Sequence, residues 1–156
     1  MPQVYFTNVN IAWAYFDIGK FKEGYPFLKF VNGNKSKYGD ESTEIVVNML
    51  NGMYYSYHND YELANVFFLK AIQAGKNSDE RSDLSYSHQE YSKFLNKIGK
   101  YEEAYVNLAS YNKITEELYN EEKLKKASIA GFNLELDEYK RQIDKIENEK
   151  TSPFKP

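Results

Sequence analysis

Three six-residue segments of this 156-residue sequence resemble one another: GKFKEG at residues 19–24, NDYELA at 59–64 and GKYEEA at 99–104. Each segment begins 40 residues after the previous one. Self-similarity at a fixed period is typical of proteins built from stacked structural repeats. The three segments therefore predict a repetitive fold.

The agreement between the copies extends to the residues around these segments. Two columns hold small residues in all three copies: Ala12, Gly52 and Ser92 in the first, and Gly24, Ala64 and Ala104 in the second. Small side chains let two helices approach each other closely. Gly19, Asn59 and Gly99 are residue types that tolerate a left-handed backbone, which often ends a helix. Each copy is therefore predicted to be a helix, a short turn and an antiparallel helix. Asp40 and Asp79 are predicted to cap the first helices of the second and third copies.

This pattern of a small residue, an aromatic residue, a Gly-x-aromatic turn and a following Ala resembles the tetratricopeptide repeat. The resemblance covers about residues 3–119. It implies an all-α superhelical array of three helix-turn-helix repeats, at about residues 1–40, 41–80 and 81–119. The period of 40 is longer than the commoner period of about 34, and the Pro that often ends such a repeat is missing. HEAT and armadillo arrays have periods near 40 as well, but they lack this turn.

After Asn120 the sequence becomes densely charged and predicts one long helix at residues 120–150, followed by a frayed tail at 151–156. Six apolar residues recur along this helix at spacings of 3 and 4: Ile129, Phe132, Leu136, Tyr139, Ile143 and Ile146. We call these six residues the apolar stripe. Their spacing is that of a heptad repeat, which is typical of coiled coils.

Two interpretations of the apolar stripe remain open from the sequence. In the first, it docks on the open end of the third repeat as a cap, which repeat arrays require for solubility. In the second, it pairs with the same stripe of a second chain and forms a homodimer. Both can hold, with the first half of the helix docking and the second half pairing.

The composition excludes several classes of protein. The chain has no cysteine, which excludes disulfides and thiolate zinc sites. The net charge is −3 and Lys and Arg do not cluster, so nucleic-acid binding by these residues is not expected. No apolar run approaches the roughly 20 residues of a membrane-spanning helix, so membrane insertion is not expected.

No combination of residues predicts catalysis, a cofactor or a metal site. The sequence lacks the glycine-rich loops that bind phosphates. His58 and His88 do not belong to a His-x-x-x-His pair, and no cysteine accompanies them as a zinc ligand. We therefore expect a protein that is not an enzyme.

In tetratricopeptide arrays, the first helix of each repeat lines a concave groove that binds peptides. The resemblance implies an apolar wall in this groove, formed by Trp13, Phe16, Met49, Met53 and Tyr57, and a basic rim formed by Lys93 and Lys97. The same columns include Phe6, Val9, Val46 and Tyr86. Alternatively, Trp13 and Phe16 pack against their own neighbours, and longer helices rotate the assignment by one residue.

These features predict a non-catalytic module that binds a protein or peptide. The apolar wall would bury an apolar segment, and Lys93 and Lys97 would orient an acidic one. Residues 117–123 and the charged helix after them are similar to the junction between tetratricopeptide repeats and output modules in bacterial signalling proteins, namely sensor histidine kinases and transcriptional regulators. That similarity implies an alternative role in signal transduction, as a relay that dimerises through its C-terminal helix. A cytoplasmic location is expected, or a periplasmic one if the chain is part of a membrane sensor.

Overall fold

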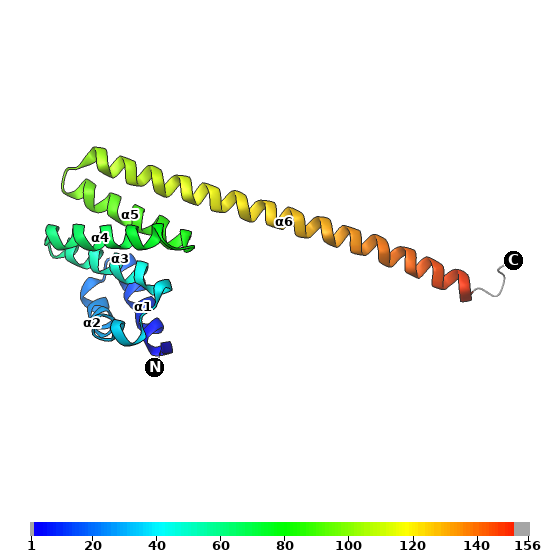
Figure 1. Cartoon of the computed structure of the whole chain (residues 1–156), viewed down its shortest axis with the longest axis horizontal. Helices are drawn as coiled ribbons and strands as arrows, with labels where there is room; N and C mark the ends of the chain where they lie inside the picture. Colours follow the sequence, from blue (N-terminus) through cyan, green and yellow to red (C-terminus); the bar gives the residue numbers. More distant parts are fainter. Residues whose placement is uncertain (1, 152–156) are drawn as a thin grey trace. The chain divides into compact units, whose positions relative to one another are not determined.

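The computed structural model describes residues 2–151, and its regular structure is helical throughout (Figure 1). Within this range the helices are α1 (Pro2–Asp17), α2 (Phe21–Tyr38), α3 (Glu41–Tyr57), α4 (Tyr61–Lys76), α5 (Arg81–Lys97) and α6 (Tyr101–Thr151). No β-strand occurs between residues 2 and 151, which confirms the all-α class. The frayed tail predicted at 151–156 lies outside the described residues, apart from Thr151, which ends α6.

Short turns with a left-handed residue join the helices into pairs. Gly19, Asn59 and Gly99 have φ angles of 78°, 61° and 83°, which confirms their predicted conformation. One residue later, the backbone N–H of Lys20 donates to the carbonyl oxygen of Tyr15 at 2.9 Å, and the other two turns contain the equivalent bond at the same length. This bond satisfies a free carbonyl at the helix end, as in the Schellman motif. Helices α1–α2, α3–α4 and α5–α6 therefore form helix-turn-helix pairs.

The two predicted caps have different outcomes. Asp40 caps α3: its carboxylate accepts from the backbone N–H of Thr43 at 3.0 Å, and the Thr43 hydroxyl accepts from the backbone N–H of Asp40 at 3.2 Å. This reciprocal pair satisfies two free amides at the helix start. The prediction for Asp79 is wrong, because Glu80 occupies the N-cap position of α5. The hydroxyl of Ser78 accepts from the backbone N–H of Glu80 at 3.0 Å instead.

The chain divides into two compact units between Thr115 and Glu116, so α6 belongs to both. In the first unit α3 is central, since it packs against α1, α2, α4 and α5. Eight of its 17 residues are buried. The first helices of the three pairs, α1, α3 and α5, contact one another in that order. Helix α3 is therefore covered on most of its circumference, and it supplies the largest share of the core.

The predicted columns of small residues lie where the two helices of a pair meet. Ala64 is fully buried. The hydroxyl of Ser92 on α5 donates to the backbone carbonyl of Ala104 on α6 at 2.7 Å. A Cβ atom on Gly52 would lie 2.9 Å from ring carbons of Phe68. These positions hold small residues because larger side chains would push the paired helices apart.

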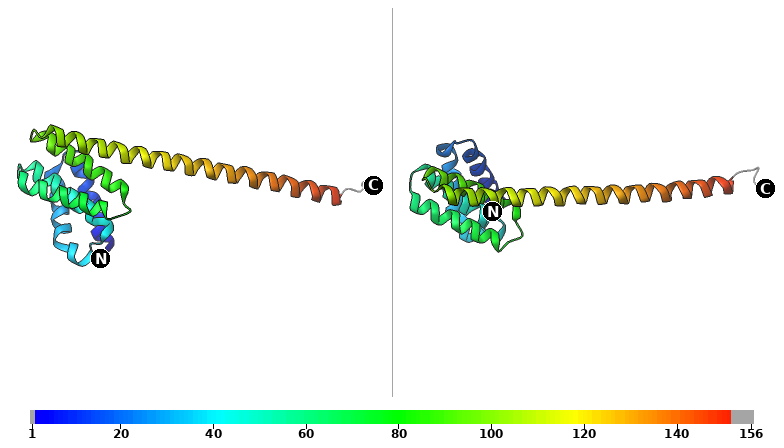
Figure 2. Two further views of the ribbon diagram at one scale, coloured as in Figure 1. Left: turned by 45° about the horizontal axis from the view of Figure 1, so that its top comes forward. Right: turned by 90° about the horizontal axis from the view of Figure 1, so that it is seen from above.

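The second unit is the part of α6 that follows Thr115, and Figure 2 shows this helix without a break along its length. Residues 120–150, which the sequence predicts to be helical, all lie within it. Every side chain from Tyr119 to Lys150 is exposed. The six residues of the apolar stripe are each between 51% and 64% exposed.

The close contact at Gly52 leads to a stability prediction. We expect Gly52→Ala to lower the free energy of unfolding by about 1–3 kcal/mol, since the new methyl group would overlap the buried ring of Phe68. Urea unfolding of the full chain, followed by circular dichroism, measures this change.

Gly33 provides the matched control for this prediction. It lies within α2, and a Cβ atom there would meet no atom within 4 Å. Gly33→Ala should therefore raise stability by about 0.5–1 kcal/mol through helix propensity alone. Equal effects of the two substitutions on the free energy of unfolding would show that the α3–α4 contact at Gly52 has room for a methyl group.

Candidate functional site

A small hollow opens on the face of the first unit that α1, α3 and α5 share. Its volume is about 220 Å³. It is lined by Phe6, Val9, Asn10 and Trp13 of α1, by Ser42, Thr43 and Val46 of α3, and by Asp83 of α5. We call it the α1–α3–α5 hollow. It forms because three helices that are far apart in the sequence lie side by side.

One residue that lines this hollow, Trp13, packs against a second aromatic ring. Trp13 of α1 and Tyr86 of α5 meet edge to face, with ring centroids 5.6 Å apart and an interplanar angle of 80°. Such edge-to-face pairs are favourable because the positive edge of one ring meets the negative face of the other. Trp13 is half-buried against the core, whereas Tyr86 is 40% exposed. The pair therefore bridges the first and third helix pairs and keeps aromatic surface accessible.

Asp83 is the only acidic side chain among the described residues that line the hollow. It is half-buried in the first turn of α5. Burial is the main cause that raises the pKa of its carboxyl above the ordinary value, and the negative charge of nearby Glu80 adds to this effect. Within residues 2–151, no side chain donates a hydrogen bond to this carboxylate or forms an ion pair with it. A half-buried carboxylate without a partner is less stable than one in water, and a cation beside it would relieve that penalty.

Three residues predicted to form the apolar wall belong to the core instead. Phe16 is 2% exposed, Met49 is fully buried and Met53 is 6% exposed. The prediction that Met49 and Met53 line an exposed groove is therefore wrong, and for Phe16 the alternative of packing against its own neighbours holds. For Met49 and Met53 the physical reason is the central position of α3, which α1, α2, α4 and α5 surround. Phe16 also packs between Phe21 and Tyr54, with ring centroids at 4.8 Å and 6.2 Å.

Among the remaining residues predicted for the wall and the rim, Trp13 lines the hollow, whereas Tyr57, Lys93 and Lys97 do not. Tyr57 is exposed, but it stacks on Phe21 with ring centroids 4.5 Å apart. Lys93 forms an ion pair with Glu90 on its own helix at 3.0 Å. Lys97 donates to the backbone carbonyl of a residue in the preceding pair and lies over an aromatic ring of α4. The predicted basic rim is thus engaged in contacts within the chain.

The sequence predicted one of two residues of this site and did not predict the other. Phe6 was already placed in the groove by the resemblance, together with Trp13 and Tyr86. Asp83 was missed, because an acidic residue at a helix start is ordinarily read as a partner of the helix dipole. The available signal was its position three residues before Tyr86, which places both side chains on one face of a helix.

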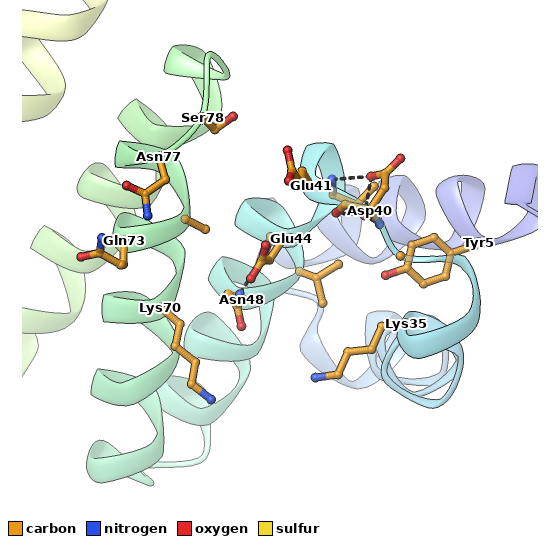
Figure 3. Close-up of a pocket in the computed structure, with 14 residues that line it drawn as sticks. Tyr5, Lys35, Asp40, Glu41, Glu44, Asn48, Lys70, Gln73, Asn77 and Ser78 are labelled. Atoms are coloured by element: carbon orange, nitrogen blue, oxygen red, sulfur yellow. Dashed lines mark hydrogen bonds between the residues drawn. The ribbon is translucent and has the colours of Figure 1, made fainter.

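A second and larger hollow, of about 700 Å³, lies where α2, α3 and α4 meet (Figure 3). Lys35 and Lys70 extend into it from opposite walls, and Glu41 and Glu44 line it as well. Asp40 also belongs to its wall, but that carboxylate is engaged in capping α3. The mixture of charges selects no particular ligand.

Within residues 2–151, no group of three or more His, Cys, Asp or Glu side chains is placed to hold a metal ion. His88 is buried, and its Nδ1 lies 2.8 Å from the side-chain oxygen of Asn107; burial lowers its pKa. In the same range, none of the helices combines the length and the apolar character needed to span a membrane.

Comparison with known proteins adds no further assignment. No protein-family model, curated protein or solved structure matches the chain.

The raised pKa of Asp83 predicts a pH-dependent change in stability. Because the folded state holds this proton more tightly than the unfolded state, the contribution of Asp83 to stability decreases as the pH rises above about 4 through its raised pKa. At pH 7 the ionised side chain therefore destabilises the fold. We expect Asp83→Asn to raise the unfolding temperature at pH 7 and to reduce the gain in stability on mild acidification.

Asp137→Asn is the matched control, since Asp137 is exposed on the second unit. It should leave the unfolding temperature unchanged at both pH values in differential scanning calorimetry. A lower unfolding temperature for Asp83→Asn at pH 7 would mean that the favourable interaction of Asp83 with the α5 dipole outweighs its burial.

Proposed function

We propose that this chain is a non-catalytic protein-interaction module whose α1–α3–α5 hollow binds a segment of a partner protein. Three helix-turn-helix pairs with left-handed turn residues support a tetratricopeptide-like array, in which first helices line the binding face. The observation that carries the proposal is the hollow itself, where exposed aromatic surface meets an unpaired carboxylate.

The size of the hollow favours a single side chain as its occupant. Pockets for whole small molecules commonly have volumes of roughly 300–1,000 Å³. At about 220 Å³ this hollow is smaller. A protein segment that inserts one side chain and lays its backbone over the neighbouring helices fits this volume better than a free metabolite.

The chemistry of the hollow favours a basic side chain. Asp83 provides a half-buried negative charge, Trp13 lines the same hollow, and Tyr86 packs against Trp13. Aromatic faces attract cations, and the attraction strengthens where water is excluded. Arg or Lys also carries a long apolar stem that could pack on Phe6 and Val9 of the wall. We therefore infer a partner segment with a basic residue, in place of the acidic segment expected from Lys93 and Lys97.

Selection from a random peptide library, displayed on phage, tests this proposal with the full chain as bait. We expect selected peptides to share an Arg or Lys next to apolar residues. Asp83→Asn should weaken binding of the resynthesised peptides roughly 10- to 100-fold in fluorescence anisotropy, since a charge-assisted contact of about 1.5–3 kcal/mol is lost.

The control is again Asp137→Asn, which should bind the peptides as the unchanged protein does. Selected peptides without a basic residue, or equal affinity for the protein and its Asp83→Asn variant, would contradict the proposal. Circular dichroism of the variant separates a loss of binding from a loss of folding.

A further inference from the structure

The apolar stripe of the second unit plays no part in the binding proposed for the hollow of the first unit. Its six side chains are each more than half exposed on one continuous helix. Large apolar side chains gathered along one helix face typically mark an interaction surface. Lys125 and Lys150 occupy the next heptad positions on either side, so charged residues bound the stripe at both ends.

We propose that the apolar stripe pairs with the same stripe of a second copy of this chain, as a parallel two-stranded coiled coil. This pairing goes beyond the binding module proposed above and does not depend on it, because the hollow lies wholly in the first unit. A coiled coil needs a helix long enough for several heptads, and α6 extends unbroken through the whole stripe.

The residues at the two core positions of the heptad are all apolar. In heptad notation the a positions hold Ile129, Leu136 and Ile143, and the d positions hold Phe132, Tyr139 and Ile146. β-Branched residues at a are the choice of parallel dimers when d holds Leu, whereas the d positions here hold two aromatic residues and Ile. Two of the three a positions hold Ile. The aromatic d residues add large apolar surface to each layer, and the Tyr139 hydroxyl can reach water at the edge.

The flanking charges agree with the parallel orientation. Glu135 is at a g position and Lys140 at the following e position. In a parallel dimer a g residue faces the e residue five positions later in the other helix, so Glu135 of each chain would face Lys140 of the second copy. Symmetry forms this pair twice. In the same arrangement Gln142 faces Glu147, and no flanking pair along the stripe has two like charges.

An antiparallel pair with the stripes fully overlapped would place the charges differently. Glu135 would face Gln142, and Lys140 would face Asn133, so both charges would lose an oppositely charged partner. Lys126 and Glu147 would face each other instead. The two orientations therefore depend on different residues, and charge reversal distinguishes them.

Leu136 and Leu134 provide a matched pair for the first experiment. Leu136 belongs to the stripe, whereas Leu134 is on the opposite face of the helix, and both are exposed, at 64% and 68%. Sedimentation equilibrium of the full chain over a range of concentrations should give the mass of a dimer for the unchanged protein and for Leu134→Glu. Leu136→Glu should give a monomer. The unfolding transition of its first unit, followed by circular dichroism, should be unchanged.

Charge reversal then tests the orientation. Glu135→Lys and Lys140→Glu should each raise the dimer dissociation constant by about tenfold, because each creates two like-charge pairs. The double variant Glu135→Lys/Lys140→Glu should restore it. Lys126→Glu should have a smaller effect than either.

Three results would overturn the proposal. The first is a monomer at every concentration, and the second is an equal loss of mass for Leu134→Glu and Leu136→Glu. The third is a dimer dissociation constant that charge reversal at Glu135 or Lys140 leaves unchanged, but that Lys126→Glu raises and the added Glu147→Lys restores. This third result would establish antiparallel pairing. None of these results bears on peptide binding at Asp83, so the two proposals can fail separately.

Discussion

The close approach of two helices through small side chains determines the arrangement of the first unit. Gly52 faces the ring of Phe68 with no room for a Cβ atom, and the Ser92 hydroxyl reaches the backbone of Ala104. A left-handed residue at each turn brings the helices back on one another and closes the helix end with a backbone hydrogen bond.

The central position of α3 decides which apolar residues remain available for binding. Met49 and Met53 lie at the spacing of a groove-facing column, but four helices cover α3 and leave both buried. Trp13 belongs to α1, at the end of the array, and it keeps part of its surface beside the α1–α3–α5 hollow. Asp83 stays in the same hollow despite the unfavourable effect of burial on its charge. A destabilising group retained at a hollow is what a binding site often contains.

The two units offer surfaces with different physical origins. The hollow exists only because α1, α3 and α5 are packed together, so any change in core packing would alter it. The apolar stripe arises from helical periodicity alone and needs no tertiary contact to form one face. In the two proposals, the first surface would select a partner by charge and shape, and the second would select its own copy by register and by flanking charges.

The sequence by itself determined the features that depend on local backbone chemistry. The turns at Gly19, Asn59 and Gly99, the cap at Asp40 and the small residues at helix contacts could be predicted because each reflects a few neighbouring residues. The start of α5 was misplaced by one residue, since Asp and Glu both occur at that helix end. Only the tertiary structure decided which predicted groove residues are buried and which line the hollow. Periodicity shows that residues share a helix face, but the neighbouring helices decide whether that face meets protein or water.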